Sequence, residues 1–166
     1  MLTVGPNRPT VAVQVGSQSS HGVEAFLSLG LWENWRAEAN LALLHAQYDD
    51  FQQSVGGVAV NFAGNQPQNV PEQVANLWLT WAFAPRWEAR GGVQIVGETF
   101  GDFANTAKRP SYTVVNGGLD YQATPTSRFS VRVYNLLDEV YAITGSSTMW
   151  LLGRPRSVEV AYSMSF

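Results

Sequence analysis

Apolar and polar residues alternate with a period of two over most of this sequence. The alternation is clearest at the C-terminus, where Val158, Val160, Tyr162, Met164 and Phe166 are separated by small or polar residues. Successive side chains of a β-strand point to opposite faces of a sheet, so the pattern predicts strands with one apolar and one polar face. About eight such strands are predicted, most of them about 9–12 residues long. They are expected at residues 11–15, 23–31, 36–43, 75–83, 87–95, 113–122, 129–134 and 157–166.

A helix is the competing interpretation for residues 35–47, which are rich in alanine and leucine. The apolar positions there, Ala37, Ala39, Leu41 and Leu43, are spaced by two and not by three and four. The spacing therefore favours a strand in this segment as well.

The predicted connections alternate between short and long. Turn residues at 33–34, 84–86 and 123–127 join strands directly, whereas residues 49–72, 98–111 and 136–156 form long connections. Such an alternation predicts an antiparallel meander with one simple rim and one elaborate rim. Residues 57–62 could form a further strand, but a strand there would disturb the alternation, so we assign them to a long loop.

Composition indicates that the apolar face contacts lipid. Charged residues make up 14%, against about 25% in typical soluble domains. Aromatic residues make up 12%, and many of them fall at predicted strand ends, as in the girdles of transmembrane β-barrels. A soluble β-sandwich or lipocalin-like barrel would have the same strand pattern with its faces reversed, but such an exterior would carry more lysine than Lys108 alone. The charges expected on the polar, lumenal face are Glu24, Arg36, Glu38, Glu88, Arg90, Asp120, Arg132 and Glu159.

Several function classes are disfavoured. A net charge of −3 argues against nucleic-acid binding, and the absence of cysteine excludes disulfides and thiolate chemistry. His21 and His45 belong to no recognisable Ser-His-acid grouping, so we expect no enzyme, no catalytic residue and no cofactor. The acidic residues Asp49, Asp50, Glu98 and Asp102 could hold calcium, but solvated loop acids are the commoner case.

Several short motifs resemble the TonB-dependent outer-membrane receptors, specifically their siderophore-receptor branch. Residues 135–138 (Asn-Leu-Leu-Asp) with Tyr141 resemble the family's Asn-Leu-Phe-Asp-x-x-Tyr, and residues 153–156 (Gly-Arg-Pro-Arg) resemble the Gly-x-Pro-Arg that opens the last strand. Residues 20–24 (Ser-His-Gly-Val-Glu) are similar to Ser-Arg-Gly-Val-Glu, and residues 69–71 to the Asn-Val-Pro that precedes a membrane strand. Phe166 matches the C-terminal aromatic signal.

The resemblance implies that residues 1–166 are the C-terminal strands of a larger, 22-stranded type of plugged outer-membrane barrel, without the plug and the earlier strands. The residues at the start have no features of a secretory signal, which agrees with a fragment. The implied function is active import of ferric siderophores across the bacterial outer membrane. The implied partners are a ferric siderophore, the TonB complex acting through the plug, the barrel assembly machinery and outer-membrane lipid. The alternative is an independent small eight-stranded barrel with a structural role.

The loop aromatics Phe51, Phe103, Tyr141 and Trp150 are the candidates for ligand contact. The alternative for each is a role in girdle or loop packing, and Tyr141 in particular is a motif residue. The resemblance further assigns Tyr162, Met164 and Phe166 to the assembly signal.

Overall fold

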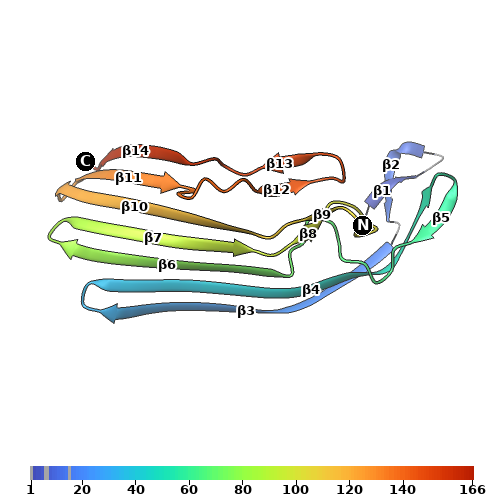
Figure 1. The fold of residues 1–166 in the computed structure, drawn as a ribbon, viewed down its shortest axis with the longest axis horizontal. Helices are drawn as coiled ribbons and strands as arrows, with labels where there is room; N and C mark the ends of the chain where they lie inside the picture. Colours follow the sequence, from blue (N-terminus) through green and yellow to red (C-terminus); the bar gives the residue numbers. More distant parts are fainter. Residues whose placement is uncertain (1, 6–7, 15) are drawn as a thin grey trace.

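The computed structural model describes residues 2–5, 8–14 and 16–166. Seven of its strands form one antiparallel meander in which sequence neighbours pair, in the order β14-β11-β10-β7-β6-β4-β3 (Figure 1). The seven strands are β3 (Gly16–Trp32), β4 (Trp35–Val55), β6 (Gln73–Ala84), β7 (Trp87–Val96), β10 (Tyr112–Thr124), β11 (Ser127–Tyr134) and β14 (Ser157–Met164). The predicted all-β meander is confirmed. Among the described residues there is no helix with the length and apolarity needed to cross a membrane.

Turns and loops fall on opposite rims, as predicted. Tight turns join β3 to β4, β6 to β7 and β10 to β11 at one end of the sheet, and the long connections lie at the other end (Figure 1). Each long connection carries its own strands: β5 (Val58–Asn61), the pair β8 (Thr99–Phe100) and β9 (Lys108–Arg109), and the pair β12 (Ala142–Gly145) and β13 (Trp150–Leu152). We call this end the long-loop rim and the other the short-turn rim.

One face of the sheet is apolar and has no second layer over it in the described part of the chain (Figure 1). Val23 is 68% exposed, Leu41 41% and Ile95 42%, although each lies within a paired strand. A soluble sandwich would cover such a face with a second sheet. An uncovered apolar face of this size is instead what a lipid-facing wall presents.

Aromatic rings line the short-turn rim of the apolar face. Trp35 stacks on Trp81 with ring centroids 5.0 Å apart, and Trp87 stacks on Tyr121 at 4.5 Å. Phe83 bridges the two pairs through contacts with Trp81 and Trp87. Because these rings come from four neighbouring strands, they form the continuous belt predicted for a membrane interface.

The polar face carries the predicted charged residues, and some of them form ion pairs between neighbouring strands. Arg132 Nη2 donates to both carboxylate oxygens of buried Asp120 at 2.7 and 2.8 Å, and Ser130 Oγ donates to the same carboxylate. The Arg132 side chain lies over Gly118, where an added Cβ would come 2.9 Å from Cδ of Arg132.

Two sequence predictions need correction. The strand predicted at 11–15 falls within β2 (Arg8–Gln14), which pairs with β1 (Leu2–Gly5) in a separate two-stranded sheet and not with the meander; Val15 lies outside the described residues. Residues 58–61, assigned to a loop, form β5 against the outer end of β4. Short and long connections still alternate along the chain, because β5 folds back within the long-loop rim and does not cross the sheet.

The sheet is open. In the described residues β3 and β14 are its two end strands and do not pair with each other. The closed eight-stranded barrel considered as the alternative is therefore not the arrangement found.

Candidate functional site

The long-loop rim has a small core of its own. Tyr48, Phe51 and Phe62 are buried together, and Phe103 packs against them from the next long connection. The Phe51 and Phe103 rings are 4.9 Å apart in an edge-on contact. Burial raises the pKa of the Tyr48 hydroxyl, an effect that a backbone hydrogen bond with Gln68 only partly offsets. The first two long connections are therefore packed into one unit.

Hydrogen bonds between the same two connections reinforce the packing. Asn65 Nδ2 donates to Phe103 O at 2.7 Å, and Gln68 Nε2 donates to Gly101 O at 2.8 Å. Asn105 is bonded to Gln66 in both directions, because its Nδ2 donates to Gln66 O and its Oδ1 accepts from Gln66 N. These amide side chains replace the backbone ladder that irregular segments lack.

Asn69 joins all three long connections. Its backbone N–H donates to Phe100 O at 3.0 Å. Its Oδ1 accepts from Thr144 Oγ1 at 2.9 Å and from the Gly145 N–H at 3.3 Å. Asn69 has a positive φ of 62°, a conformation that asparagine tolerates better than most residues.

Asp102 organises the turn between β8 and β9. Its Oδ1 accepts from the backbone N–H groups of Thr106 and Ala107, and its Oδ2 accepts from the Thr106 hydroxyl. Burial raises the pKa of this carboxyl, but the hydrogen bonds from Thr106 and Ala107 outweigh burial and hold the pKa below its ordinary value of 3.8.

The motif at 135–138 holds the end of β11 beside the start of β14. Asn135 is 1% exposed, and its Nδ2 donates to Glu139 O at 2.8 Å and to Arg154 O at 3.0 Å. Asp138 accepts the Arg156 N–H at 2.9 Å through Oδ1. The two motifs recognised in the sequence therefore bind each other, and they fix where β14 begins.

Tyr141 completes this contact. Its ring lies 4.4 Å from that of Tyr112, and a Cβ built at Gly153 would come within 2.0 Å of Tyr141 Cζ. Glycine at 153 is thus what allows the chain to pass over the ring. Arg154 lies 3.9 Å from the centroid of the Tyr134 ring, so the arginine also packs on an aromatic side chain.

The four ligand-contact candidates are therefore in different environments. Phe51 is 2% exposed and Phe103 packs with it, so both contribute to the core of the rim. Tyr141 is half-buried against Tyr112 and Gly153. Trp150 is 48% exposed on β13 and is the candidate most available to a ligand.

The assembly-signal residues lie on or just past β14. Tyr162 packs on Phe129 at 4.8 Å, Met164 is opposite Ser127, and Phe166 follows the strand fully exposed.

The four acids considered for calcium do not gather into a metal site. Glu98 pairs with Lys108 at 2.6 Å, Asp49 accepts from Ser19 Oγ at 2.7 Å, and Asp102 is occupied in its turn. Within residues 2–5, 8–14 and 16–166 no group of three or more potential metal ligands is arranged to hold an ion.

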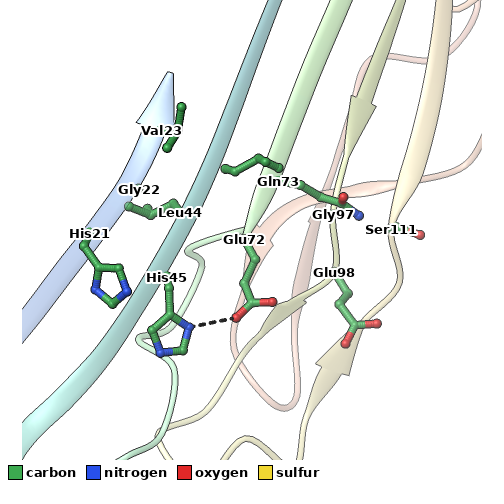
Figure 2. Close-up of a pocket in the computed structure, with 11 residues that line it drawn as sticks. His21, Gly22, Val23, Leu44, His45, Glu72, Gln73, Gly97, Glu98 and Ser111 are labelled. Atoms are coloured by element: carbon green, nitrogen blue, oxygen red, sulfur yellow. Dashed lines mark ion pairs between the residues drawn. The ribbon is translucent and has the colours of Figure 1, made fainter. Parts of the chain in front are cut away.

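A cavity of about 560 Å³ lies where the meander meets the long-loop rim. His21 of β3 and His45 of β4 are opposite each other in register, with ring centroids 5.2 Å apart. His45 Nδ1 lies 3.5 Å from Glu72 Oε1, and Figure 2 shows the two imidazoles, Glu72 and Glu98 in a row along the cavity. The sequence alone does not reveal that the two histidines lie side by side, because their pairing depends on the register between β3 and β4.

Residues 1–136 match the family described as TonB dependent receptor-like, beta-barrel. The chain belongs to this family. Strands β3 to β11, which form most of the meander and of its uncovered apolar face, lie within the matched residues.

Curated relatives agree with this assignment. The chain is 28% identical over 137 residues to the probable TonB-dependent siderophore receptor PiuA of Acinetobacter baumannii, covering 80% of this chain and 18% of that protein. It is 28% identical over 147 residues to an iron-regulated outer membrane virulence protein of Vibrio cholerae, covering 84% of this chain and 21% of the relative. The chain thus spans about a fifth of the length of these relatives.

Solved structures show the same fold. The crystal structure of PiuA from A. baumannii superimposes with a TM-score of 0.82 at 24% identity, over 98% of this chain and 24% of that one. BauA, the ferric preacinetobactin receptor of A. baumannii, gives a TM-score of 0.73 at 22% identity, over 100% of this chain and 25% of that one.

Proposed function

We propose that residues 1–166 form one wall of an outer-membrane receptor that imports ferric siderophores with energy supplied through TonB. The observation that carries the proposal is the uncovered apolar face of a meander that belongs to this receptor family. The names of the relatives, a siderophore receptor and an iron-regulated outer membrane protein, support iron uptake. Among the described strands, β3 pairs with β4 and β14 pairs with β11, and the proposal places further strands of a larger barrel beside these two end strands.

The proposed function is binding and transport, with no covalent step. The long-loop rim faces the outside of the cell, and its packed hairpins hold a rigid frame around the entrance. Trp150 contacts the ligand directly in this proposal, and Tyr141 supports the hairpin that carries it. Phe51 and Phe103 act indirectly in this proposal, because they fix the shape of the first two long connections from the core of the rim.

The other proposed partners follow from the membrane placement. The apolar face contacts outer-membrane lipid, and the polar face contacts the plug through which TonB acts. Tyr162, Met164 and Phe166 present an apolar strand end to the barrel assembly machinery.

Iron uptake by cells tests the proposal. The intact protein is produced in an iron-starved strain that lacks its own siderophore receptors, and uptake of ⁵⁵Fe is measured with a catecholate and a hydroxamate siderophore. A tonB deletion of the same strain is the energy control, and Trp150→Ala is compared with Trp32→Ala at the opposite rim. We expect uptake of at least one complex that depends on both the protein and TonB and that falls for Trp150→Ala only. Uptake that is equal with and without the protein for every complex offered contradicts the proposal.

A further inference from the structure

Three tryptophans form one row across neighbouring strands at the short-turn rim. Trp32 of β3 lies opposite Trp35 of β4, and Trp35 lies opposite Trp81 of β6. Side chains that are opposite in register project from the same face of a sheet, and for Trp35 and Trp81 this is the apolar face. Trp35 stacks on Trp81 at 5.0 Å, whereas Trp32 is 74% exposed. The row thus presents aromatic surface to the surroundings of the sheet.

A cavity of about 450 Å³ lies beside this row. Its lining consists of the three tryptophans together with Glu33 and Asn34 of the turn between β3 and β4. The turn is held against β6, because the Ala82 N–H donates to Asn34 O at 2.9 Å. The cavity is therefore bounded by aromatic rings and by a turn whose position is fixed.

The polar groups of this cavity have no partners in the described part of the chain. Glu33 is exposed, and no described cation pairs with its carboxylate. Arg36, three positions along the chain, pairs instead with Glu38 at 4.0 Å. The indole N–H groups of the three tryptophans likewise donate to no acceptor among the described residues. One carboxylate and three hydrogen-bond donors are thus available to a ligand.

This combination suits a ligand that carries an ammonium group next to a phosphate. A cation is attracted to the face of an aromatic ring, and tryptophan attracts it most strongly. A primary ammonium also donates hydrogen bonds to a carboxylate, and such charge-assisted bonds are among the strong ones. The indole N–H groups are donors only, so they can bind a phosphate. A headgroup with negative charge alone would be repelled by Glu33.

The position of the cavity favours a lipid as the source of these groups. Ala37 and Leu79 lie opposite each other two positions from Trp35 and Trp81, toward the middle of the sheet and on the same face. The proposed function places this face against lipid. Aromatic belts of membrane barrels lie at the level of the headgroups. A headgroup in the cavity therefore leaves its acyl chains along the apolar face.

We propose that this cavity binds the headgroup of a phosphoethanolamine phospholipid. The ammonium group lies against the tryptophan faces and donates to Glu33, and the phosphate accepts from indole N–H groups. The acyl chains run over Ala37 and Leu79. The proposal rests on the outward orientation of the apolar face given under the proposed function.

Native mass spectrometry of the intact protein tests the site. The protein is released from nanodiscs that contain equal parts of phosphatidylethanolamine, phosphatidylcholine and phosphatidylglycerol with the same acyl chains, and the retained lipids are counted. We expect phosphatidylethanolamine to be retained about two- to tenfold over phosphatidylcholine, because only the primary ammonium donates to Glu33. We expect phosphatidylcholine to be retained about two- to fivefold over phosphatidylglycerol, because both ammonium lipids meet the ring faces.

Two matched pairs of variants separate these contributions. Glu33→Gln removes the charge of the carboxylate and should bring phosphatidylethanolamine close to phosphatidylcholine, whereas Glu88→Gln makes the same change on the polar face. Trp81→Leu should remove the advantage of both ammonium lipids over phosphatidylglycerol. Trp87→Leu makes the same change in the belt but outside the cavity, where Trp87 stacks on Tyr121. Because Glu33 is exposed in a turn, its variant decides the result if Trp81→Leu does not fold.

A lysine tetrapeptide distinguishes a lipid from a protein side chain as the occupant. The peptide offers primary ammonium groups without acyl chains, so at equal concentration it should leave the retained lipid in place. Displacement of the lipid by the peptide would overturn the lipid as the occupant.

Equal retention of the three lipids by a protein that inserts into nanodiscs would overturn the lipid site and leave the receptor function intact. The same holds if each variant and its control change the retention equally. A protein that does not insert into nanodiscs would overturn the membrane placement and the lipid site together.

Discussion

Thr144 Oγ1 donates a hydrogen bond to Asn69 Oδ1 at 2.9 Å, although 75 positions separate the two residues. The same oxygen accepts from the Gly145 N–H, and the Asn69 N–H donates to Phe100 O. One asparagine thus ties the first long connection to the other two. The hairpins of the long-loop rim are therefore expected to move as one body.

Removing this acceptor should loosen the third hairpin. Asn69→Gly keeps the positive φ but loses both hydrogen bonds to β12, at about 0.5–1.5 kcal/mol each. We expect faster hydrogen–deuterium exchange at residues 142–152, with unchanged exchange in β6 and β7. Asn69→Asp keeps the oxygen acceptor and is the matched control. Equal protection in the glycine and aspartate variants would show that the bond does not hold the hairpin.

Gly153→Ala should disturb the passage of the chain over Tyr141. The added methyl group meets the ring at 2.0 Å, and overpacking of this kind costs about 1–3 kcal/mol. Gly91→Ala is the control, because the nearest atom to its Cβ is 4.0 Å away. Thermal unfolding of the two variants in detergent compares them. The double variant Gly153→Ala, Tyr141→Ala should recover part of the loss, and no recovery would mean that the ring is not the obstacle.

Two neighbouring positions on β6 distinguish the faces of the sheet. Leu77 is on the apolar face and Asn76 on the polar face, where its Nδ2 donates to Asn40 Oδ1. Arginine in the middle of a lipid-facing strand costs about 2–4 kcal/mol, so Leu77→Arg should lower the amount of heat-modifiable protein in the outer membrane. Asn76→Arg should assemble nearly normally. Similar yields of the two variants would argue against the assigned orientation.

The turn held by Asp102 should weaken in acid. The pKa of this carboxyl is lower in the folded protein than its ordinary value of 3.8, so its stabilising contribution is present above that pH and is lost as the pH falls through the folded-state pKa. Compared with Asp102→Ala, the wild type should show stronger protection of residues 102–107 near neutral pH, with exchange corrected for its intrinsic pH dependence. The difference should shrink below about pH 4. A difference that is constant with pH would assign the protection to other contacts.

The meander could be predicted from the sequence because alternation along a strand depends on local residues alone. Pairing between strands does not. The apolar residues near 11–15 alternate correctly, yet β2 pairs with β1 because the partner of a strand is set by the chain around it. The β4–β5 hairpin did have a local signal: Gly56 and Gly57, both with positive φ, stand between Val55 and Val58. The alternation of short and long connections predicts a loop at residues 57–62 instead, and the structure has β5 there.

The candidate site was less predictable for the same reason. Aromatic residues in the loops were visible in the sequence, but burial separates Phe51 from Trp150, and burial depends on contacts between distant segments. The roles of Asn69 and of the His21–His45 pair arise only from register and from loop packing. Residues whose function depends on a neighbour far along the chain leave no periodic trace in the sequence.

Alternating exposure along β6 is the most direct test of a lipid-facing wall. The protein has no cysteine, so single cysteines can be placed at residues 75–83 without a background signal. Each variant is labelled in intact outer membranes with a membrane-impermeant maleimide and, in parallel, with a lipid-soluble one. We predict a period of two, with odd positions labelled by the lipid-soluble reagent and even positions by the water-soluble one. Uniform labelling, or the opposite alternation, would contradict the central claim that the apolar face of this sheet lies against lipid.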